Sequence, residues 1–263
     1  MKATKPFNFK IFAILMTGSL TAALAALPYT LELEKAVLEK LPVPIWVVAA
    51  SSLVQSTILL AIAIGSGLFL AGNIGLGLPI LEAKLRGEAV GDKLRAILPI
   101  SILTGVLVSI LIIGLDATIF SPALRAELGA KAAALNLRGA QPAAWKGLLA
   151  SFYGGIDEEV LLRLFLMTLL AWLGKFLSKD SAGHPTGKVF WVTNILAAVL
   201  FGLAHLPATA TMVPLTPLVV ARAVVLNGLG GVMFGYLYWK RGLEAAMISH
   251  FSADIVLHVL LAL

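Results

Sequence analysis

The sequence has no cysteine and few charged residues, and both absences limit what the protein can be. Without cysteine, the chain of 263 residues has no disulfide, no thiolate metal site and no cysteine nucleophile. Only 13% of its residues are charged, against about a quarter in soluble globular proteins. The formal net charge is +6, yet no run of basic residues occurs, so nucleic acid is not an expected partner. No internal repeat is evident, which argues against transporter folds built from two related halves.

Most of the remaining residues are apolar. Hydrophobic residues make up 59% of the chain, and the mean hydropathy is +0.96. Because a spanning helix needs about 20 predominantly apolar residues, these long runs predict an all-α, polytopic transmembrane helical bundle of about seven spans, with a range of about six to eight. The predicted spans are 11–27, 44–71, 96–115, 146–172, 190–206, 216–238 and 244–262.

The connections between spans indicate the orientation. Residues 76–95 interleave charged and apolar side chains, which predicts a surface-lying amphipathic helix or loop, and the polar segment 116–144 predicts the other long connection. A cytoplasmic N-terminus places most loop Lys and Arg inside, so we expect a multi-pass protein of the plasma membrane in that orientation. Residues 1–28 also have features of a secretory signal peptide, but Leu27 and Pro28 form a poor cleavage context, so we expect retention.

The stretch GGIDEEVLLRLFL, residues 154–166, places Asp157, Glu158, Glu159 and Arg163 inside a predicted span. Ionisable groups at membrane depth are costly, so they normally face a partner or a cavity and indicate function. Glu159 and Arg163 are four residues apart and are expected to pair. Glu158, turned by about 100°, is left without an obvious cation and is a candidate general base. The alternative is a buried ion network that only fixes helix packing.

Two later spans carry further polar groups. VLFGLAHLP ends the fifth span with His205, and MISHFSADIVLH places His250 and Asp254 on one face of the seventh. A lone histidine on an apolar helix is more often a packing residue, but three polar clusters on three spans favour a common site. We expect His184, in a polar loop, to be solvated, and His258 to be structural or interfacial.

The segments EEVLLR, FGLAH and HFSAD resemble, in order and roughly in spacing, the EExxxR, FxxxH and HxxxN/D motifs of the CAAX protease and bacteriocin-processing (CPBP, or Abi) family of intramembrane glutamyl endopeptidases. The EExxxR motif alone is weak evidence for the family, whereas the three motifs in this order are specific to it. The resemblance covers about residues 145–263, the expected catalytic core, and residues 1–144 supply the N-terminal helices and the amphipathic segment of the same membrane domain.

The resemblance implies an intramembrane glutamic-type protease, of the CAAX prenyl protease type, that needs no metal or other cofactor. Glu158 would be the base that activates water, and His205 would hold and polarise that water. His250 and Asp254 would face the developing oxyanion. The supporting residues would be Glu159, Arg163 and Phe201. Many family members carry asparagine at position 254, and an aspartate donates a hydrogen bond only when protonated, so the role of Asp254 stays open.

The same residues also allow other functions. His205, His250 and a carboxylate suit a catalytic zinc site, although no HExxH helix delivers them. A non-enzymatic immunity or binding protein, or a proton-coupled carrier, would use the same buried groups differently. As partners we expect the lipid bilayer and a membrane-anchored or hydrophobic peptide substrate, with a lipidated, CAAX-like terminus as one option. Arg222 is a candidate for binding a terminal carboxylate or for a role at a helix end.

The depths of the candidate residues agree only in part. At 1.5 Å per residue, Glu158 lies about 18 Å below the outer edge and His250 about 21 Å, in a core of roughly 30 Å. His205 lies only about 8 Å deep if its span starts at residue 190. We therefore expect that helix to start later or to continue through Pro207 towards Pro214, unless the spans are miscounted.

Overall fold

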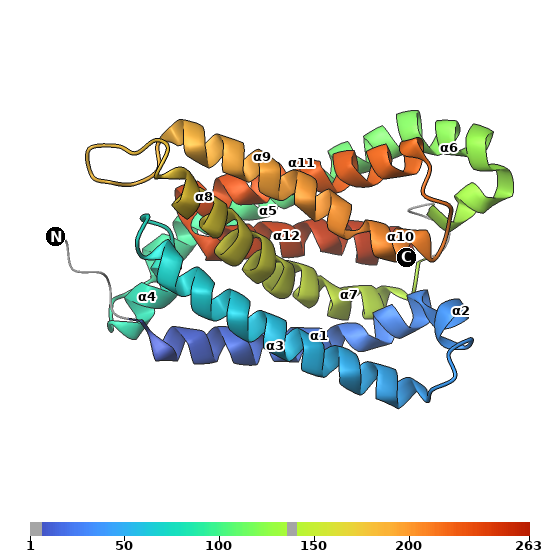
Figure 1. The fold of residues 1–263 in the computed structure, drawn as a ribbon, viewed down its shortest axis with the longest axis horizontal. Helices are drawn as coiled ribbons and strands as arrows, with labels where there is room; N and C mark the ends of the chain where they lie inside the picture. Colours follow the sequence, from blue (N-terminus) through green and yellow to red (C-terminus); the bar gives the residue numbers. More distant parts are fainter. Residues whose placement is uncertain (1–6, 136–140) are drawn as a thin grey trace.

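The computed structural model describes residues 7–135 and 141–263. Figure 1 shows an elongated bundle in which the long helices run along one axis. All regular elements of the described residues are helices, and no strand occurs among them. The predicted all-α class is therefore confirmed.

Six helical runs in the described chain are long and apolar enough to span a bilayer. They are Phe9–Leu33 (α1), Ile45–Ala71 (α3), Gly91–Leu135 (α5, η1, α6 and η2), Gly187–Ala210 (α9 and α10), Pro217–Arg241 (α11) and Leu243–Ala262 (α12, η5 and η6). A seventh run carries the charged stretch and consists of α7 (Ala144–Phe152), η3 (Tyr153–Glu158), η4 (Val160–Met167) and α8 (Thr168–Gly174). Each predicted span thus has a helical counterpart.

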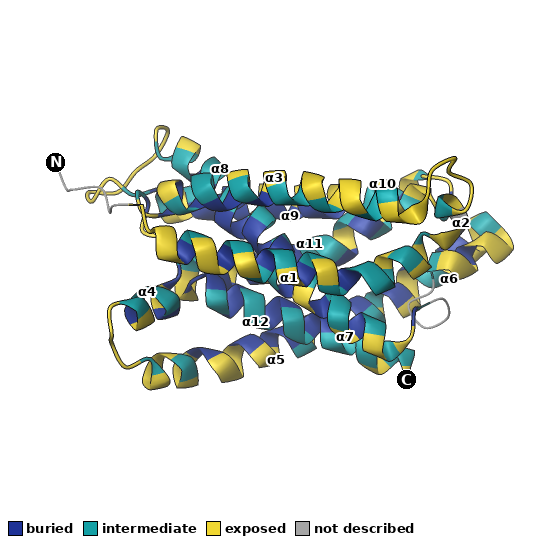
Figure 2. Cartoon of the chain, turned by 90° about the horizontal axis from the view of Figure 1, so that it is seen from below, coloured by how far each residue is buried: buried dark blue, intermediate teal, exposed yellow. Residues whose placement is uncertain are grey.

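The burial pattern is inverted relative to a soluble protein. Large apolar side chains such as Trp46, Ile58 and Ile110 are exposed, and Figure 2 shows exposed positions along the outer faces of α1, α3 and α5. Polar and charged side chains such as Arg163 lie inside the bundle. A soluble protein would hide most of these apolar groups, so the outer surface suits a lipid environment and the protein is a multi-pass membrane protein.

The helix α12 (Leu243–Asp254) sits deep in the bundle because glycines on its neighbours let it approach closely. A Cβ added at Gly105 of α5 would lie 2.2 Å from the Ser249 carbonyl oxygen, and one added at Gly155 would lie 2.9 Å from the Phe251 Cβ. Small residues at helix contacts are how membrane helices bring their backbones together. Hence α12 is held between α5 and the charged run.

The helices α9 (Gly187–Ala204) and α11 pack against each other in the same way. A Cβ at Gly202 would lie 2.5 Å from the Val224 Cα, and one at Gly231 would lie 2.8 Å from the Ala198 Cβ. These contacts leave no room for larger side chains. The close packing places Phe201 of α9 and Phe234 of α11 beside Arg163.

The prediction of a polar connection over residues 116–144 is wrong for residues 116–135. The helix α5 (Gly91–Leu115) continues into η1 (Asp116–Phe120), α6 (Ser121–Leu128) and the 3-10 segment η2 (Gly129–Leu135). Asp116 does not end the helix because its buried carboxylate accepts a hydrogen bond from Arg222 Nε at 2.6 Å. That partner lies far away in the sequence, so no local pattern reveals it. Residues 136–140 lie outside the described part.

The segment 76–95 contains the short helix α4 (Pro79–Leu85), as predicted for a surface helix, and then the beginning of α5 at Gly91. Ile80 and Ala83 of α4 are buried. The carboxylate of Glu244, at the start of α12, accepts hydrogen bonds from the backbone amides of Ile80 and Leu81 at 3.0 and 2.8 Å. These amides have no partner within their own helix, so α12 caps α4. The remaining short helix, α2 (Lys35–Leu38), connects α1 to α3.

Candidate active site

The charged stretch lies where the run 144–174 changes from α-helical to π-helical geometry, in η3 and η4. A π turn rotates the residues that follow it, and such turns are frequent at functional sites. Gly154 stands four residues before Glu158, and a Cβ there would lie 2.0 Å from Asp254 Oδ2. The glycine therefore lets α12 press its aspartate against the backbone close to Glu158.

Glu159 lies at the centre of a closed set of contacts. Its side chain is fully buried, and Oε1 lies 3.2 Å from Arg163 Nη1, which confirms the predicted pair. The same oxygen accepts a hydrogen bond from His250 Nδ1 at 2.7 Å. Arg163 also donates to the Gly231 carbonyl oxygen at 3.1 Å. Glu159 thus fixes the orientation of the His250 ring, as a carboxylate behind a catalytic histidine does.

Two phenylalanine rings enclose the cation and the imidazole. Arg163 Cζ lies 5.1 Å from the ring centroid of Phe201 and 5.6 Å from that of Phe234. The Phe234 ring also stacks on His250, with the centroids 4.6 Å apart. Cation–π contacts of this kind strengthen when water is excluded. Phe201 was expected as a supporting residue, whereas no motif pointed to Phe234.

Glu158 differs from Glu159 because it remains partly open. Its side chain is 23% exposed, and Oε2 lies 3.6 Å from His250 Nε2. Asp254 Oδ1 lies 3.7 Å from the same nitrogen. Since Nδ1 already donates to Glu159, Nε2 faces two carboxyl groups. If all three facing groups were unprotonated they would repel one another, so at least one proton resides among them. This arrangement can bind, give up and accept a proton.

Asp254 has a second imidazole beside it. His258 Nε2 lies 4.0 Å from Asp254 Oδ1, and the ring contacts Tyr29 of α1 edge-on, with the centroids 5.6 Å apart. His258 was expected to be structural or interfacial, and it lies between α1 and Asp254, next to the cluster that consists of Glu158, Glu159, Arg163, His250 and Asp254. Its spacing of four residues from Asp254 was the signal available in the sequence.

His205 lies at the end of α9, where it is the residue between α9 and α10 (Leu206–Ala210). Its Nδ1 donates to the Phe201 carbonyl oxygen at 2.8 Å, which leaves Nε2 as an acceptor. The Phe201 ring contacts both His205 and His250, at centroid distances of 4.8 and 5.9 Å. Within the described residues His205 pairs with no carboxylate, so it borders the cluster through Phe201.

The sequence predicts that His205 lies less deep in the membrane than Glu158 and His250, and the structure explains part of this difference. The helix α9 begins at Gly187, earlier than the predicted residue 190, so a later start is wrong. The run continues through Pro207 to Ala210, which confirms the second option as far as that residue.

Two charged residues take other positions. The fully buried carboxyl of Asp157 faces Ser19 of α1, and neither side chain makes a hydrogen bond of regular geometry among the described residues. Arg222 donates to Asp116 Oδ1 at 2.6 Å and to the Leu135 carbonyl oxygen at 2.9 Å. The guanidinium thus fastens α11 to the extension of α5. It forms no part of the cluster around Glu158.

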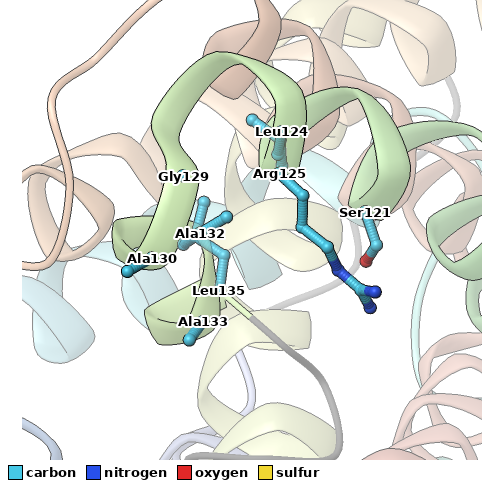
Figure 3. Close-up of a pocket in the computed structure, with 8 residues that line it drawn as sticks. All are labelled: Ser121, Leu124, Arg125, Gly129, Ala130, Ala132, Ala133 and Leu135. Atoms are coloured by element: carbon cyan, nitrogen blue, oxygen red, sulfur yellow. The ribbon is translucent and has the colours of Figure 1, made fainter.

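The described residues contain no group of three His, Asp or Glu side chains arranged to hold a metal ion. Two cavities lie elsewhere in the described part of the chain. One, of about 330 Å³, is formed by α6 and η2 and is lined by Ser121, Leu124 and Arg125 among others (Figure 3). Another, of about 730 Å³, lies beside α2 and the start of α7 and is lined by Pro28, Glu32 and Lys146 among others. Neither contains a residue of the cluster.

Comparison with protein families gives a match over the charged residues. The profile described as type II CAAX prenyl endopeptidase Rce1-like matches residues 140–256, a segment that contains Glu158, Glu159, Arg163, His205, His250 and Asp254. The resemblance to the CAAX protease family drawn from the three motifs is thereby confirmed. Comparisons with curated proteins and with solved structures give no match.

Proposed function

We propose that this protein hydrolyses peptide bonds of membrane-associated substrates with water activated by Glu158, because residues 140–256 match the profile described as type II CAAX prenyl endopeptidase Rce1-like. The observation that carries the proposal is the difference between two adjacent carboxylates. Glu159 is fully buried and held by Arg163 and His250. Glu158 is partly open, and its partner in the described part of the chain is the His250 imidazole at 3.6 Å. A general base needs this freedom to take a proton from water.

In the proposed reaction, Glu158 removes a proton from a water molecule as the water oxygen attacks the peptide carbonyl carbon. The carbonyl oxygen becomes an oxyanion. When the oxyanion collapses to a carbonyl again, the C–N bond breaks and the leaving amine takes the proton from Glu158. The His205 ring, with Nδ1 engaged by the Phe201 carbonyl, offers Nε2 as an acceptor that holds the water.

His250 serves the developing oxyanion. Its Nδ1 is fixed by Glu159, so Nε2 points to the space shared with Glu158 and Asp254. A proton on Nε2 or on Asp254 donates to the oxyanion, and such a donor stabilises the transition state more strongly in a water-poor site. Arg163 balances the charge of Glu159, while Phe201 and Phe234 exclude water from the pair.

The surroundings of the site support a proposal for the substrate class. The enclosing helices expose apolar side chains on their outer faces, so a substrate reaches the site from the bilayer. We propose a hydrophobic or lipid-anchored peptide, with a prenylated CAAX-like protein as the family implies, and no cofactor. Residues 145–263 form the catalytic core, and the N-terminus is cytoplasmic in the plasma membrane, as the distribution of Lys and Arg favours.

The test is cleavage of a membrane-anchored peptide library by the purified protein in liposomes. We expect Glu158→Gln to lower turnover by at least about 10²-fold, the usual contribution of a general base, without a change in thermal midpoint. Glu127→Gln is the matched control, because it makes the same change on an exposed residue of α6 and is expected to cleave normally. Undiminished turnover of Glu158→Gln rejects the proposed base.

Two further readouts separate the alternatives. Stoichiometric zinc in active protein, with loss of turnover on chelation, would replace the glutamate mechanism by a zinc mechanism. Full biological effect of a Glu158→Gln protein that cleaves nothing would indicate a binding or immunity protein instead.

A further inference from the structure

The helices α9 and α11 present matching stripes of exposed side chains on their outer faces. On α9, Ile195, Trp191 and Lys188 follow one another towards the end of the bundle at which this helix begins, and all three are exposed. Their spacing of four and three residues places them on one face of the helix. The stripe therefore changes from apolar through aromatic to basic over about 10 Å.

The helix α11 repeats this order in the opposite chain direction. Met233, Tyr236 and Lys240 are exposed and are spaced by three and four residues, so they also share a face. The two stripes lie side by side, because the Trp191 ring stacks on the Tyr236 ring with the centroids 5.6 Å apart. The two helices are antiparallel, so both stripes have their lysine at the same end of the bundle. The six side chains form one surface, the α9–α11 patch.

The rings at the middle of the α9–α11 patch are of the kind that membrane proteins place at the boundary between lipid and water. Trp191 and Tyr236 both contact the Trp239 ring edge-on, at centroid distances of 6.0 and 6.2 Å. Lys240 Nζ lies 3.5 Å from the centroid of the Trp239 ring. Tryptophan and tyrosine gather at the level of the lipid headgroups because their rings are amphipathic. The patch therefore extends from the level of the acyl chains to that of the headgroups.

The positive charge at the basic end of the patch is not balanced within the described part of the chain. The segments 172–192 and 233–241 contain five cations and one acid. That acid, Asp180, accepts hydrogen bonds from the backbone amides of Ala182 and His184 in its own loop. Among residues 7–135 and 141–263, neither Lys188 nor Lys240 forms an ion pair with a carboxylate. The basic end of the patch is thus complementary to an anion.

We propose that the α9–α11 patch binds an anionic phospholipid. Its acyl chains lie along Ile195 and Met233, and its headgroup phosphate lies at Lys188 and Lys240. The lipid has its parts in the same order as the stripes, and lysines at a membrane surface attract anionic headgroups. In the proposed orientation the basic end faces the cytoplasm, where the leaflet carries the anionic lipids. The inference goes beyond the proposed peptidase function and does not depend on it.

The experiment measures lipids bound to the purified full-length protein by native mass spectrometry. Phosphatidylglycerol and phosphatidylcholine with identical acyl chains are titrated separately, so that only the headgroup differs. We expect the wild-type protein to bind phosphatidylglycerol about 30-fold more tightly, because each of the two lysines contributes about fivefold. The double variant Lys188→Gln with Lys240→Gln is expected to lose most of that preference.

The matched control is Lys40→Gln with Lys131→Gln, which removes the same charge from two exposed lysines, one after α2 and one in η2. Figure 1 shows α2 and α6 at the end of the bundle opposite to the start of α9. The control is expected to keep the preference, and an equal loss in both double variants would overturn the proposal in favour of general charge attraction. Wild-type protein without a preference would overturn it with no variant needed, and dimers in place of bound lipid would assign the patch to a second copy.

Discussion

Among the described residues, the ion pair of Asp116 with Arg222 and that of Glu159 with Arg163 differ in whether further acidic groups lie beside the pair. In the pair of Asp116 and Arg222, the carboxylate also accepts from the Ser121 hydroxyl at 3.1 Å, and the guanidinium also donates to the Leu135 carbonyl oxygen. In the pair of Glu159 and Arg163, the same carboxylate oxygen also binds His250. Beyond that imidazole lie two more carboxyl groups, Glu158 and Asp254.

The pair of Asp116 and Arg222 therefore has the features of a structural ion pair, whereas the cluster around His250 has the features of a candidate active site. Asp116 and Arg222 neutralise each other and join η1 to α11. The cluster around His250 contains more acidic groups than cations, and one of the acids is open. Excess acidic groups in a water-poor place require a shared proton, which is the condition for acid and base catalysis.

The sharpest test of the contrast is His250→Gln. The change removes the group that links Glu158, Glu159 and Asp254, so we expect turnover to fall by about 10²- to 10³-fold, as for loss of an oxyanion donor. Cleavage kinetics of folded protein measure it. Wild-type turnover of His250→Gln would show that the cluster around His250 has only a structural role, like the pair of Asp116 and Arg222.

Gly154→Ala should disturb the open cluster without changing a charge. The new Cβ would meet Asp254 Oδ2 at 2.0 Å, so the aspartate must move, and a displacement of about 1 Å typically costs about 10²-fold in rate. Gly114→Ala is the control, because nothing lies within 4 Å of its added Cβ. Equal turnover of the two variants would contradict the placement of Asp254 beside the charged run.

Arg163→Met tests whether the closed part of the cluster stabilises the fold. It leaves Glu159 buried with only His250 as a partner, and breaking a buried pair costs about 3–5 kcal/mol. We expect a lower thermal midpoint together with reduced turnover. A midpoint equal to that of the wild-type protein would mean that Arg163 contributes no net stability.

Asp116→Asn should have the smallest effect on chemistry. It weakens the bond to Arg222 and lowers the thermal midpoint, because a partly buried guanidinium loses its counter-charge. Turnover per folded molecule is expected to stay at the wild-type level. Activity that falls while the midpoint stays unchanged would move Arg222 into the site and restore its expected role in binding a carboxylate.

Hydropathy alone predicts the seven helical runs, because each apolar run must be long enough to cross the bilayer. It fails at residues 116–135, where Asp116 looks like the end of a span until Arg222 neutralises it. Local spacing predicts the pair of Glu159 and Arg163, four residues apart. It does not predict that Glu159 also binds His250, since that contact depends on how glycines let α12 approach.

The residues of the candidate site also fall into those that sequence motifs predict and those that only tertiary packing brings together. The motifs named Glu158, His205, His250 and Asp254, and the fold places His250 and Asp254 beside Glu158 while His205 contacts them only through Phe201. Phe234, Tyr29 and His258 join the cluster through packing between separate helices. No motif or spacing in the sequence predicts that Phe234 and Tyr29 lie there, because their positions depend on tertiary contacts.

Chemical rescue of Glu158→Ala tests the central claim most directly. Removing this partly exposed side chain leaves room for a small carboxylate, so we predict that turnover falls by at least about 10²-fold and that added formate restores part of it in proportion to its concentration. Chloride at the same ionic strength should restore nothing. Turnover of Glu158→Ala equal to that of the wild-type protein, or equal recovery with chloride, would contradict a role for Glu158 as the base.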